Sequence, residues 1–358
     1  MFPPLERSIP GHLAGNGPDG QLHDLGGDGV NIGLLGAGRI GALHAQTLVR
    51  HPAISRLLVF DPIVARSTEL AATVDADVAG SVEELLAAVD AVFIASSTDS
   101  HAGFLVQAAR AGLPVFCEKP IASDLESTDR AIEAVDRAGI PVLMGFNRRF
   151  DAGFQRARAV VADGTLGQLM LVVGHHHDHR PPPEEYIPVS GGQYKDQLIH
   201  DFDLLRFVTG DEVVAVHAAG SSVGLEMVAK YADTAVSIVT LWLRSGAMAV
   251  LCGARQDPVG YDVRMEVFGT GDSIAVGMDD RTPIRSLEAG GHDPVDPYRE
   301  WLARFGASYQ TEVDAFVSMV RGEIDSPCTV YDARAALSIA EACSRSLSKG
   351  GPVEVRAA

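Results

Sequence analysis

The chain has 358 residues, 46% of them apolar and 21% charged, so it is long enough for two domains with separate cores and has a globular composition. No apolar run approaches the roughly 20 residues that a membrane helix needs, and a formal charge of −18 repels phosphate backbones, which argues against membrane and nucleic-acid partners. No CxxC spacing joins the four cysteines, Cys117, Cys252, Cys328 and Cys343, so we expect free thiols. The start of the sequence lacks the pattern of a secretory signal, and together with the free thiols this predicts a cytoplasmic protein.

Residues 1–30 are rich in Gly, Pro and Asp, and we interpret them as a mobile extension outside the fold. Over residues 31–150, short apolar runs such as "NIGLL", "RLLVFD" and "AVFIAS" alternate with segments typical of helices. This alternation predicts a doubly wound parallel sheet, covered by helices on both faces, in a Rossmann-type α/β domain. The helices are expected to begin near Ile40, Val64, Ser81, His101 and Asp124.

Residues 151–358 follow a different pattern. A helix near 151–163 leads to the strand "QLMLVVGHHH", a Pro-rich loop and the helix that carries Asp196 and His200. Four strand-like runs follow at short intervals, which predicts a large, open and mostly antiparallel or mixed sheet in a second, α+β domain. Helices are expected at 298–321 and 331–348, and the last of these is a candidate to pack back on the first domain.

A glycine motif opens the first domain. It is a G-x-G-x-x-G pattern between an expected strand and an expected helix, formed by Gly36, Gly38 and Gly41, with Arg39 and Ile40 inside the loop. In this setting the glycines allow a tight turn and a close approach of the backbone to a pyrophosphate at the helix N-terminus. Asp61 follows twenty residues later, at the end of the next strand, where it would bind the adenosine ribose and favour NAD over NADP. The alternative is a glycine turn in an α/β fold that binds no nucleotide.

Two further stretches follow strand ends on the same side of the sheet. "ASSTDSH" contains Ser97 and His101, and "CEKP" contains Glu118 and Lys119. Ligands of open α/β sheets bind at the carboxyl ends of the strands, so these four side chains are expected near the nicotinamide half of the cofactor. Lys119 precedes a proline and is placed to donate to a substrate oxygen. A surface ion pair of Glu118 is the alternative reading.

Asp196 and His200 stand four residues apart in "SGGQYKDQLIHDFD", a spacing that puts both side chains on one face of a helix. By spacing alone they could form a solvated surface, a metal clamp or a proton-handling pair.

The histidine run "GHHHDHR" also invites a metal reading, since histidine is a common metal ligand. Because side chains alternate along a strand, His175 and His177 should point one way and His176 and Asp178 the other. No single face then collects three ligands, and we expect no metal site.

Together these motifs resemble the glucose–fructose oxidoreductase/inositol dehydrogenase family, also called Gfo/Idh/MocA. The resemblance covers residues 31–349 and depends on "GAGRIG", the ribose aspartate, "EKP", "GFNRRFD" and "GGQYKDQLIHDFD" in this order. "EKP" together with the D-x-x-x-H pattern is the specific part. The Pro-rich loop, "GYDVRMEVFG" and "SPCTVYDARAALSIAEA" are most similar to the myo-inositol 2-dehydrogenase branch.

The resemblance implies roles for individual residues. Lys119, Asp196 and His200 match the catalytic positions, with His200 as the base that takes the hydroxyl proton. Asn147 and Arg148 match positions that border the nicotinamide and the polyol. Asp178 and Tyr261 fall near positions that contact the substrate. Relatives often carry Arg at the position of His177, and this departure puts the exact substrate in doubt.

The sequence therefore predicts an NAD-dependent dehydrogenase that oxidises a secondary hydroxyl of a cyclic polyol or sugar, with myo-inositol as the leading substrate. One rival is another sugar or aminocyclitol dehydrogenase, or a ketose reductase of the same family. The other is a non-catalytic NAD-binding regulator. The family resemblance also implies a homodimer or homotetramer joined through the open sheet of the second domain.

Overall fold

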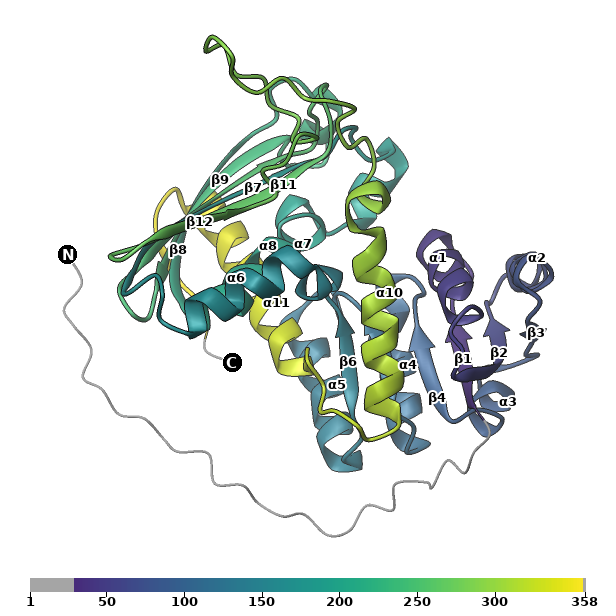
Figure 1. Ribbon diagram of the computed structural model, residues 1–358. Helices are drawn as coiled ribbons and strands as arrows, with labels where there is room; N and C mark the ends of the chain where they lie inside the picture. The colour runs from purple at the N-terminus through teal and green to yellow at the C-terminus, as the bar shows by residue number, and fades with distance from the viewer. Residues whose placement is uncertain (1–28, 357–358) are drawn as a thin grey trace.

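The structure is a computed structural model that describes residues 29–356, and it contains two sheets with helices packed around them (Figure 1). The predicted extension lies outside the described residues except for its last two positions, and Val30 already begins the first strand. Within the described part of the chain, no helix is long and apolar enough to cross a membrane.

The first sheet is parallel throughout and has the strand order β3-β2-β1-β4-β5-β6. This order confirms the predicted doubly wound Rossmann architecture. Its strands are β1 (Val30–Leu35), β2 (Ile54–Phe60), β3 (Asp77–Val78), β4 (Ala91–Ile94), β5 (Val115–Glu118) and β6 (Val142–Gly145). The helices between them are α1 (Arg39–Leu48), α2 (Val64–Val74), α3 (Val82–Ala87), α4 (Thr98–Arg110) and α5 (Leu125–Ala138).

The ends of α5 illustrate how local sequence sets these elements. Asp124 caps its start, where the Oδ1 atom accepts the backbone N–H of Ser127 at 2.7 Å, and Gly139 ends it at φ 65°. Four of the five predicted helix starts are correct to within one residue. The fifth is wrong: α4 begins at Thr98, so His101 lies inside its first turn rather than at its start.

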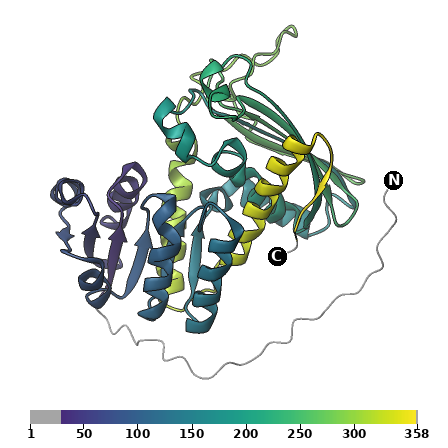
Figure 2. The ribbon, with the colours of Figure 1, turned by 180° about the vertical axis from the view of Figure 1, so that it is seen from behind.

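Two helices from the end of the chain complete the molecule. α10 (Trp301–Val320) packs on the first sheet beside α1, where Phe316 meets Phe93 edge-on at 5.5 Å between ring centroids (Figure 1). α11 (Val330–Lys349) contacts α5 and β6 of the first layer as well as the second sheet (Figure 2). Both helices of the last sixty residues therefore contribute to the layer around the Rossmann sheet.

The second sheet has seven strands in the order β12-β11-β7-β10-β9-β8-β13. β7 and β10 run parallel and the other neighbours run antiparallel, so the predicted mixed, mostly antiparallel sheet is confirmed. Its strands are β7 (Leu169–His177), β8 (Val213–Ser221), β9 (Val236–Leu243), β10 (Met248–Ala254), β11 (Asp262–Gly269), β12 (Ser273–Val276) and β13 (Val353–Glu354). The remaining elements are η1 (Asn147–Phe150), α6 (Ala152–Ala162), η2 (Glu184–Val189), α7 (Gln193–Asp196), α8 (Ile199–Thr209) and α9 (Glu226–Ala229).

The two faces of this sheet differ. α6, α8 and α11 cover one face, and within residues 29–356 no helix lies on the other (Figure 1). Along β9, Val239 and Leu241 are buried on the covered face, while Ile238 on the opposite face is 56% exposed. This alternation is expected of a half-covered sheet, and the predicted open face is confirmed.

Candidate active site

The glycine loop between β1 and α1 has the backbone that a dinucleotide requires. Gly36 has φ 110°, and a Cβ atom there would come within 2.5 Å of the Ser96 backbone. A Cβ on Gly41 would lie 2.0 Å from the carbonyl oxygen of Gly36. A Cβ on Gly38, in contrast, would meet no atom within 4 Å, so this glycine faces open space. Two glycines thus allow the turn, and the third leaves room for a phosphate to approach.

Asp61 stands at the end of β2 and is tied to this loop. Its Oδ2 atom accepts the backbone N–H of Ala37 at 2.8 Å, and Oδ1 accepts that of Ile63 at 2.9 Å. The side chain is 7% exposed. A carboxylate has about four acceptor positions, so these two bonds leave capacity for ribose hydroxyls.

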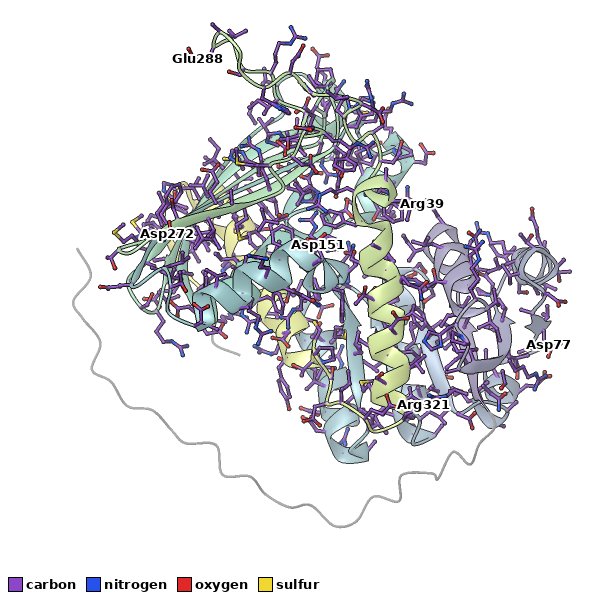
Figure 3. All side chains as sticks on the ribbon, viewed as in Figure 1. Arg39, Asp77, Asp151, Asp272, Glu288 and Arg321 are labelled. Carbon is purple, nitrogen blue, oxygen red and sulfur yellow. The ribbon has the colours of Figure 1, made fainter. Side chains whose placement is uncertain are left out.

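Arg39 and Ile40 begin α1 at the mouth of the loop. Figure 3 shows Arg39 at the end of α1 nearest the start of α10. Its guanidinium lies 5.9 Å from the centroid of the Trp301 ring, at the first residue of α10. The exposed arginine therefore lies beside the glycine loop and the first residue of α10, where a cofactor phosphate would be within its reach.

The two residues predicted after β4 have different environments. Ser97 is exposed at the N-terminal end of α4. His101 is buried, and its ring nitrogens lie 2.8 Å from the Pro120 carbonyl and 3.0 Å from the Ser96 carbonyl. The imidazole of His101 thus joins the ends of β4 and β5 behind the site, and its polar atoms are already engaged.

Glu118 and Lys119 end β5 with opposite orientations. Glu118 accepts a hydrogen bond at Oε1 from the buried His44 of α1, with 2.8 Å between the atoms, which ties "EKP" to the nucleotide-binding helix. Lys119 extends toward the second lobe, and its Nζ donates to the backbone oxygen of Asp196 at 3.0 Å. The Lys119–Pro120 peptide is cis.

The helix expected to carry both Asp196 and His200 is interrupted. α7 ends at Asp196 and α8 begins at Ile199. The carbonyl of Gln193 accepts from the N–H groups of both Gln197 and Leu198, at 3.0 Å each, so the regular i to i−4 pattern is lost there. The Asp196 carbonyl lies at the end of α7, where carbonyls lack helical partners, and the Lys119 ammonium satisfies it.

Among the described residues, the side chains that contact the Asp196 carboxylate come from segments other than the one that carries His200. Tyr186 from η2 donates its hydroxyl to Oδ1 at 3.0 Å, and Arg255 approaches Oδ2 at 3.5 Å. Arg255 is fully buried and also binds Asp233 at 2.8 Å. The carboxylate is therefore fixed in place by a tyrosine and an arginine.

His200 lies on α8 with the edge of its ring toward Phe146, at 5.9 Å between centroids. Its Nδ1 atom is buried and has no hydrogen-bond partner. Burial, followed by the charges of Lys119, Arg148 and His176, lowers the pKa of His200 well below its ordinary value of 6.5. The imidazole is therefore neutral at physiological pH, the form that can accept a proton.

Asn147 and Arg148 occupy the turn after β6, and both are buried. Asn147 donates from Nδ2 to the hydroxyl of Ser308 on α10 at 3.4 Å. Arg148 donates from Nη1 to Asp201 at 2.7 Å and from Nη2 to the hydroxyl of Tyr261 at 3.4 Å. Arg148 thus joins the Rossmann lobe to α8 and to the start of β11.

Asp178 directly follows β7, and Tyr261 directly precedes β11, the strand paired with β7 in the second sheet. Asp178 accepts at Oδ2 from the side chain of Gln197, at the helix break, at 2.7 Å. Burial raises the pKa of Tyr261 to about 12, so its hydroxyl keeps its proton at neutral pH. The predicted residues Lys119, Arg148, Asp178, Tyr261 and His200 therefore surround the same region between the lobes.

The histidine run alternates as predicted. His176 is buried toward α8, where its Nδ1 lies 2.6 Å from Asp201, while His175 and His177 pack against each other on the open face. Among the residues that the structure describes, no three His, Cys, Asp or Glu side chains gather in a group that could hold a metal.

Four side chains of this region were not predicted from the sequence as part of the site: Tyr186, Arg255, His176 and Asp201. Two of them had a usable signal. The alternation along β7 already placed His176 on the same face as Asp178, and Asp201 directly follows His200. Tyr186 lies ten residues before Asp196 and Arg255 lies 59 residues after it, and no local pattern marks either one.

Comparisons with known proteins agree with this geometry. Residues 30–146 match an oxidoreductase family with an NAD-binding Rossmann fold, and residues 154–275 match the Gfo/Idh/MocA C-terminal domain. The chain belongs to the Gfo/Idh/MocA oxidoreductase family. The resemblance inferred from the motifs is thereby confirmed, and with it the assignment as an NAD-dependent oxidoreductase that acts on CH–OH groups.

Individual members of the Gfo/Idh/MocA family are similar over nearly the whole chain. The myo-inositol 2-dehydrogenase of Thermotoga maritima is 34% identical, covering 91% of this chain and 98% of the relative. The inositol 2-dehydrogenase of Rhizobium meliloti is 32% identical, covering 91% and 99%. The scyllo-inositol dehydrogenase of Lactobacillus casei, solved with NAD(H) and scyllo-inositol, superposes with a TM-score of 0.83 at 25% identity, covering 91% and 99%.

The residues of this Gfo/Idh/MocA chain fit the cofactor of the family. The open space before Gly38, the tight packing at Gly36 and Gly41, and the partly engaged carboxylate of Asp61 together suit a pyrophosphate and a ribose. When bound, NAD supplies the hydride acceptor.

Proposed function

We propose that this protein oxidises a secondary hydroxyl of an inositol with NAD, with myo-inositol and its 2-keto product as the leading reaction. The observation that carries the proposal is the 3.0 Å contact by which Lys119 of the Rossmann lobe reaches the turn between Asp196 and His200 of the other lobe. The inositol dehydrogenases among the relatives supply the substrate class.

The roles follow from the environments of these residues. His200 is neutral, so it takes the hydroxyl proton as the carbinol carbon loses its hydride. The ammonium of Lys119 stabilises negative charge that develops on the substrate oxygen. Arg148, Asp178 and Tyr261 offer donors and an acceptor that can hold other hydroxyls of the ring and orient it.

The test is a set of progress curves that follow NADH absorbance with myo-inositol, scyllo-inositol and glucose, each with NAD and with NADP. We expect turnover with an inositol isomer and NAD. No NADH formation with any inositol isomer would remove the leading substrate, and a preference for glucose would favour the rival assignment to sugars.

We also propose that the enzyme is a homodimer or homotetramer that associates through the open face of the second sheet. Four partly exposed apolar side chains stand side by side there in register: Phe268, Leu171, Met248 and Trp242. A continuous apolar row of this kind on a surface is typical of a protein interface, and a second copy would cover it symmetrically.

A reducing, cytoplasmic location fits the thiols. Cys117, Cys328 and Cys343 are buried and Cys252 is half-buried, and all four are free in the structure.

A further inference from the structure

Asp201 follows His200 in α8, and its carboxylate binds two other side chains of the site. Oδ1 accepts from Nη1 of Arg148 at 2.7 Å, and Oδ2 lies 2.6 Å from Nδ1 of His176. These three residues are at most 4% exposed. Charge-assisted hydrogen bonds in a buried environment that excludes water are strong, and they fix the orientation of both partners of Asp201.

The imidazole of His176 lies among residues of the polyol side. Its Nε2 is 3.7 Å from Oδ1 of Asp178, and its ring meets Tyr261 edge-on at 5.9 Å between centroids. Nη2 of Arg148 lies 3.0 Å from the same ring. Asp201 therefore binds two groups that lie among the residues assigned to the polyol.

We propose that Asp201 is a positioning residue of the active site, which acts through Arg148 and His176 and holds both toward the polyol. The identity of the substrate in this statement rests on the proposed function, whereas the contacts of Asp201 do not. Through these contacts Asp201 also favours a proton on the His176 imidazole.

The pKa shifts of His176 and His200 support different roles for the two imidazoles. Burial and the Arg148 charge oppose a proton on His176, but Asp201 and Asp178 outweigh them, so the pKa of His176 is raised. The pKa of His200 is lowered, in part by His176 itself. The two shifts are therefore opposite: the site favours a neutral His200, and it favours a proton on His176 more than water does.

The charged and titratable groups around the pair come from every element packed against it. They are Arg148 of η1, Lys119 after β5, Asp178 after β7, Tyr261 before β11 and Asp201 of α8. Tyr261 keeps its proton at neutral pH, and Arg148 keeps its charge. The carboxylate of Asp201 is thus the group whose removal changes His176 most directly.

The first experiment measures the histidine rings themselves by NMR in full-length protein with ¹⁵N-labelled histidine, with the His176 signals assigned from His176→Asn. In Asp201→Asn we expect the pKa of His176 to fall by about one to two units, because a buried imidazole loses its carboxylate. In Asp201→Glu it should stay near the wild-type value. This readout needs no substrate, so it separates failure of the positioning role from failure of the proposed function.

The second experiment measures kcat and KM with the accepted inositol. We expect Asp201→Asn to lower kcat/KM by about 10- to 100-fold, as for other residues that orient groups of a site, and Asp201→Glu to recover most of it. The matched control is His51→Asn, which removes a histidine far from the site, after α1, and should leave both constants unchanged.

Two results would overturn the proposal: an unmoved His176 titration in folded Asp201→Asn, or an unchanged kcat/KM. Should that variant fail to fold, His176→Asn replaces it. The charge of His176 contributes to the lowered pKa of His200, so loss of that imidazole should raise the pKa of His200 and move the acid limb of kcat/KM to higher pH. A limb that stays in place overturns the proposal.

Discussion

Arg149 binds both carboxylate oxygens of Asp203, with 2.8 Å from Nε to Oδ2 and 2.6 Å from Nη2 to Oδ1. Arg149 lies in the turn that follows the last strand of the Rossmann sheet, and Asp203 lies on the helix that carries His200. Both side chains are buried. This two-bond ion pair therefore fixes the helix of the proposed base to the end of the dinucleotide-binding lobe.

Removal of one partner of this pair should cost stability. In Arg149→Met the Asp203 carboxylate is left buried without its cation, and the free energy of unfolding should fall by about 3–5 kcal/mol in urea titrations. The control is Arg130→Met, which breaks an exposed pair with Glu126 and should cost at most about 1 kcal/mol. An equal loss of unfolding free energy in the two variants would mean that the buried pair contributes no more to stability than the exposed one.

The pH profile of oxidation should reflect the lowered pKa of His200. The base must be unprotonated, so kcat/KM falls only when the pH drops through its pKa, and the acid limb should lie below the ordinary value of 6.5. His200→Gln should lower kcat/KM by roughly 10²- to 10⁴-fold. An acid limb at or above the ordinary value would contradict the lowered pKa.

Tyr186 and Asp196 should act as a unit. Tyr186→Phe removes one hydrogen bond to the carboxylate, and we expect kcat/KM to fall by about three- to tenfold, in line with a bond worth roughly 1 kcal/mol. In an Asp196→Asn background the same change should have a much smaller effect. The matched control is Tyr231→Phe, an equally exposed tyrosine whose hydroxyl binds Glu184. Additive losses would show that Tyr186 acts independently of Asp196.

Asp61 should set the choice of dinucleotide. Asp61→Ser removes the charge that repels a 2′-phosphate, so KM for NAD should rise by about tenfold while the ratio of kcat/KM for NAD over NADP falls. Asp77→Ser, at an exposed position on the neighbouring edge strand, should leave both constants unchanged. A constant NAD to NADP ratio in Asp61→Ser would refute the assigned role.

A charge on the open sheet face should disrupt association. Ile238→Glu places a carboxylate on the same open face, four residues along β9 from Trp242 of the apolar row, and we expect light scattering after gel filtration to show a smaller species with the far-UV spectrum retained. Leu287→Glu, at a 95% exposed position on the projecting loop whose tip carries Glu288, is the control (Figure 3). A wild-type protein that is already monomeric would exclude the proposed assembly.

Features that depend on local sequence could be predicted. The glycine loop follows from Gly36, Gly38 and Gly41, because the turn, the close packing and the helix start involve neighbouring residues. The open and covered faces of the second sheet follow from the alternation of apolar residues along its strands. The opposite orientations of His176 and His177 follow from the same rule.

Features that depend on competition between alternative tertiary partners could not be predicted from the sequence. The helix break before His200 arises because the Gln193 carbonyl accepts two N–H groups, and the spacing of Asp196 and His200 gives no hint of it. His101 has the position of a ligand-binding residue but its nitrogens meet two backbone carbonyls. These choices are decided by tertiary packing, which a motif does not encode.

The acceptor that Lys119 finds in the second lobe is a main-chain oxygen. No point substitution can delete that atom. A change of the side chain at position 196 would therefore leave the Lys119 ammonium bound there as long as the turn keeps its shape. Variation of the neighbouring side chains could then alter which polyol is accepted without loss of the lysine's placement.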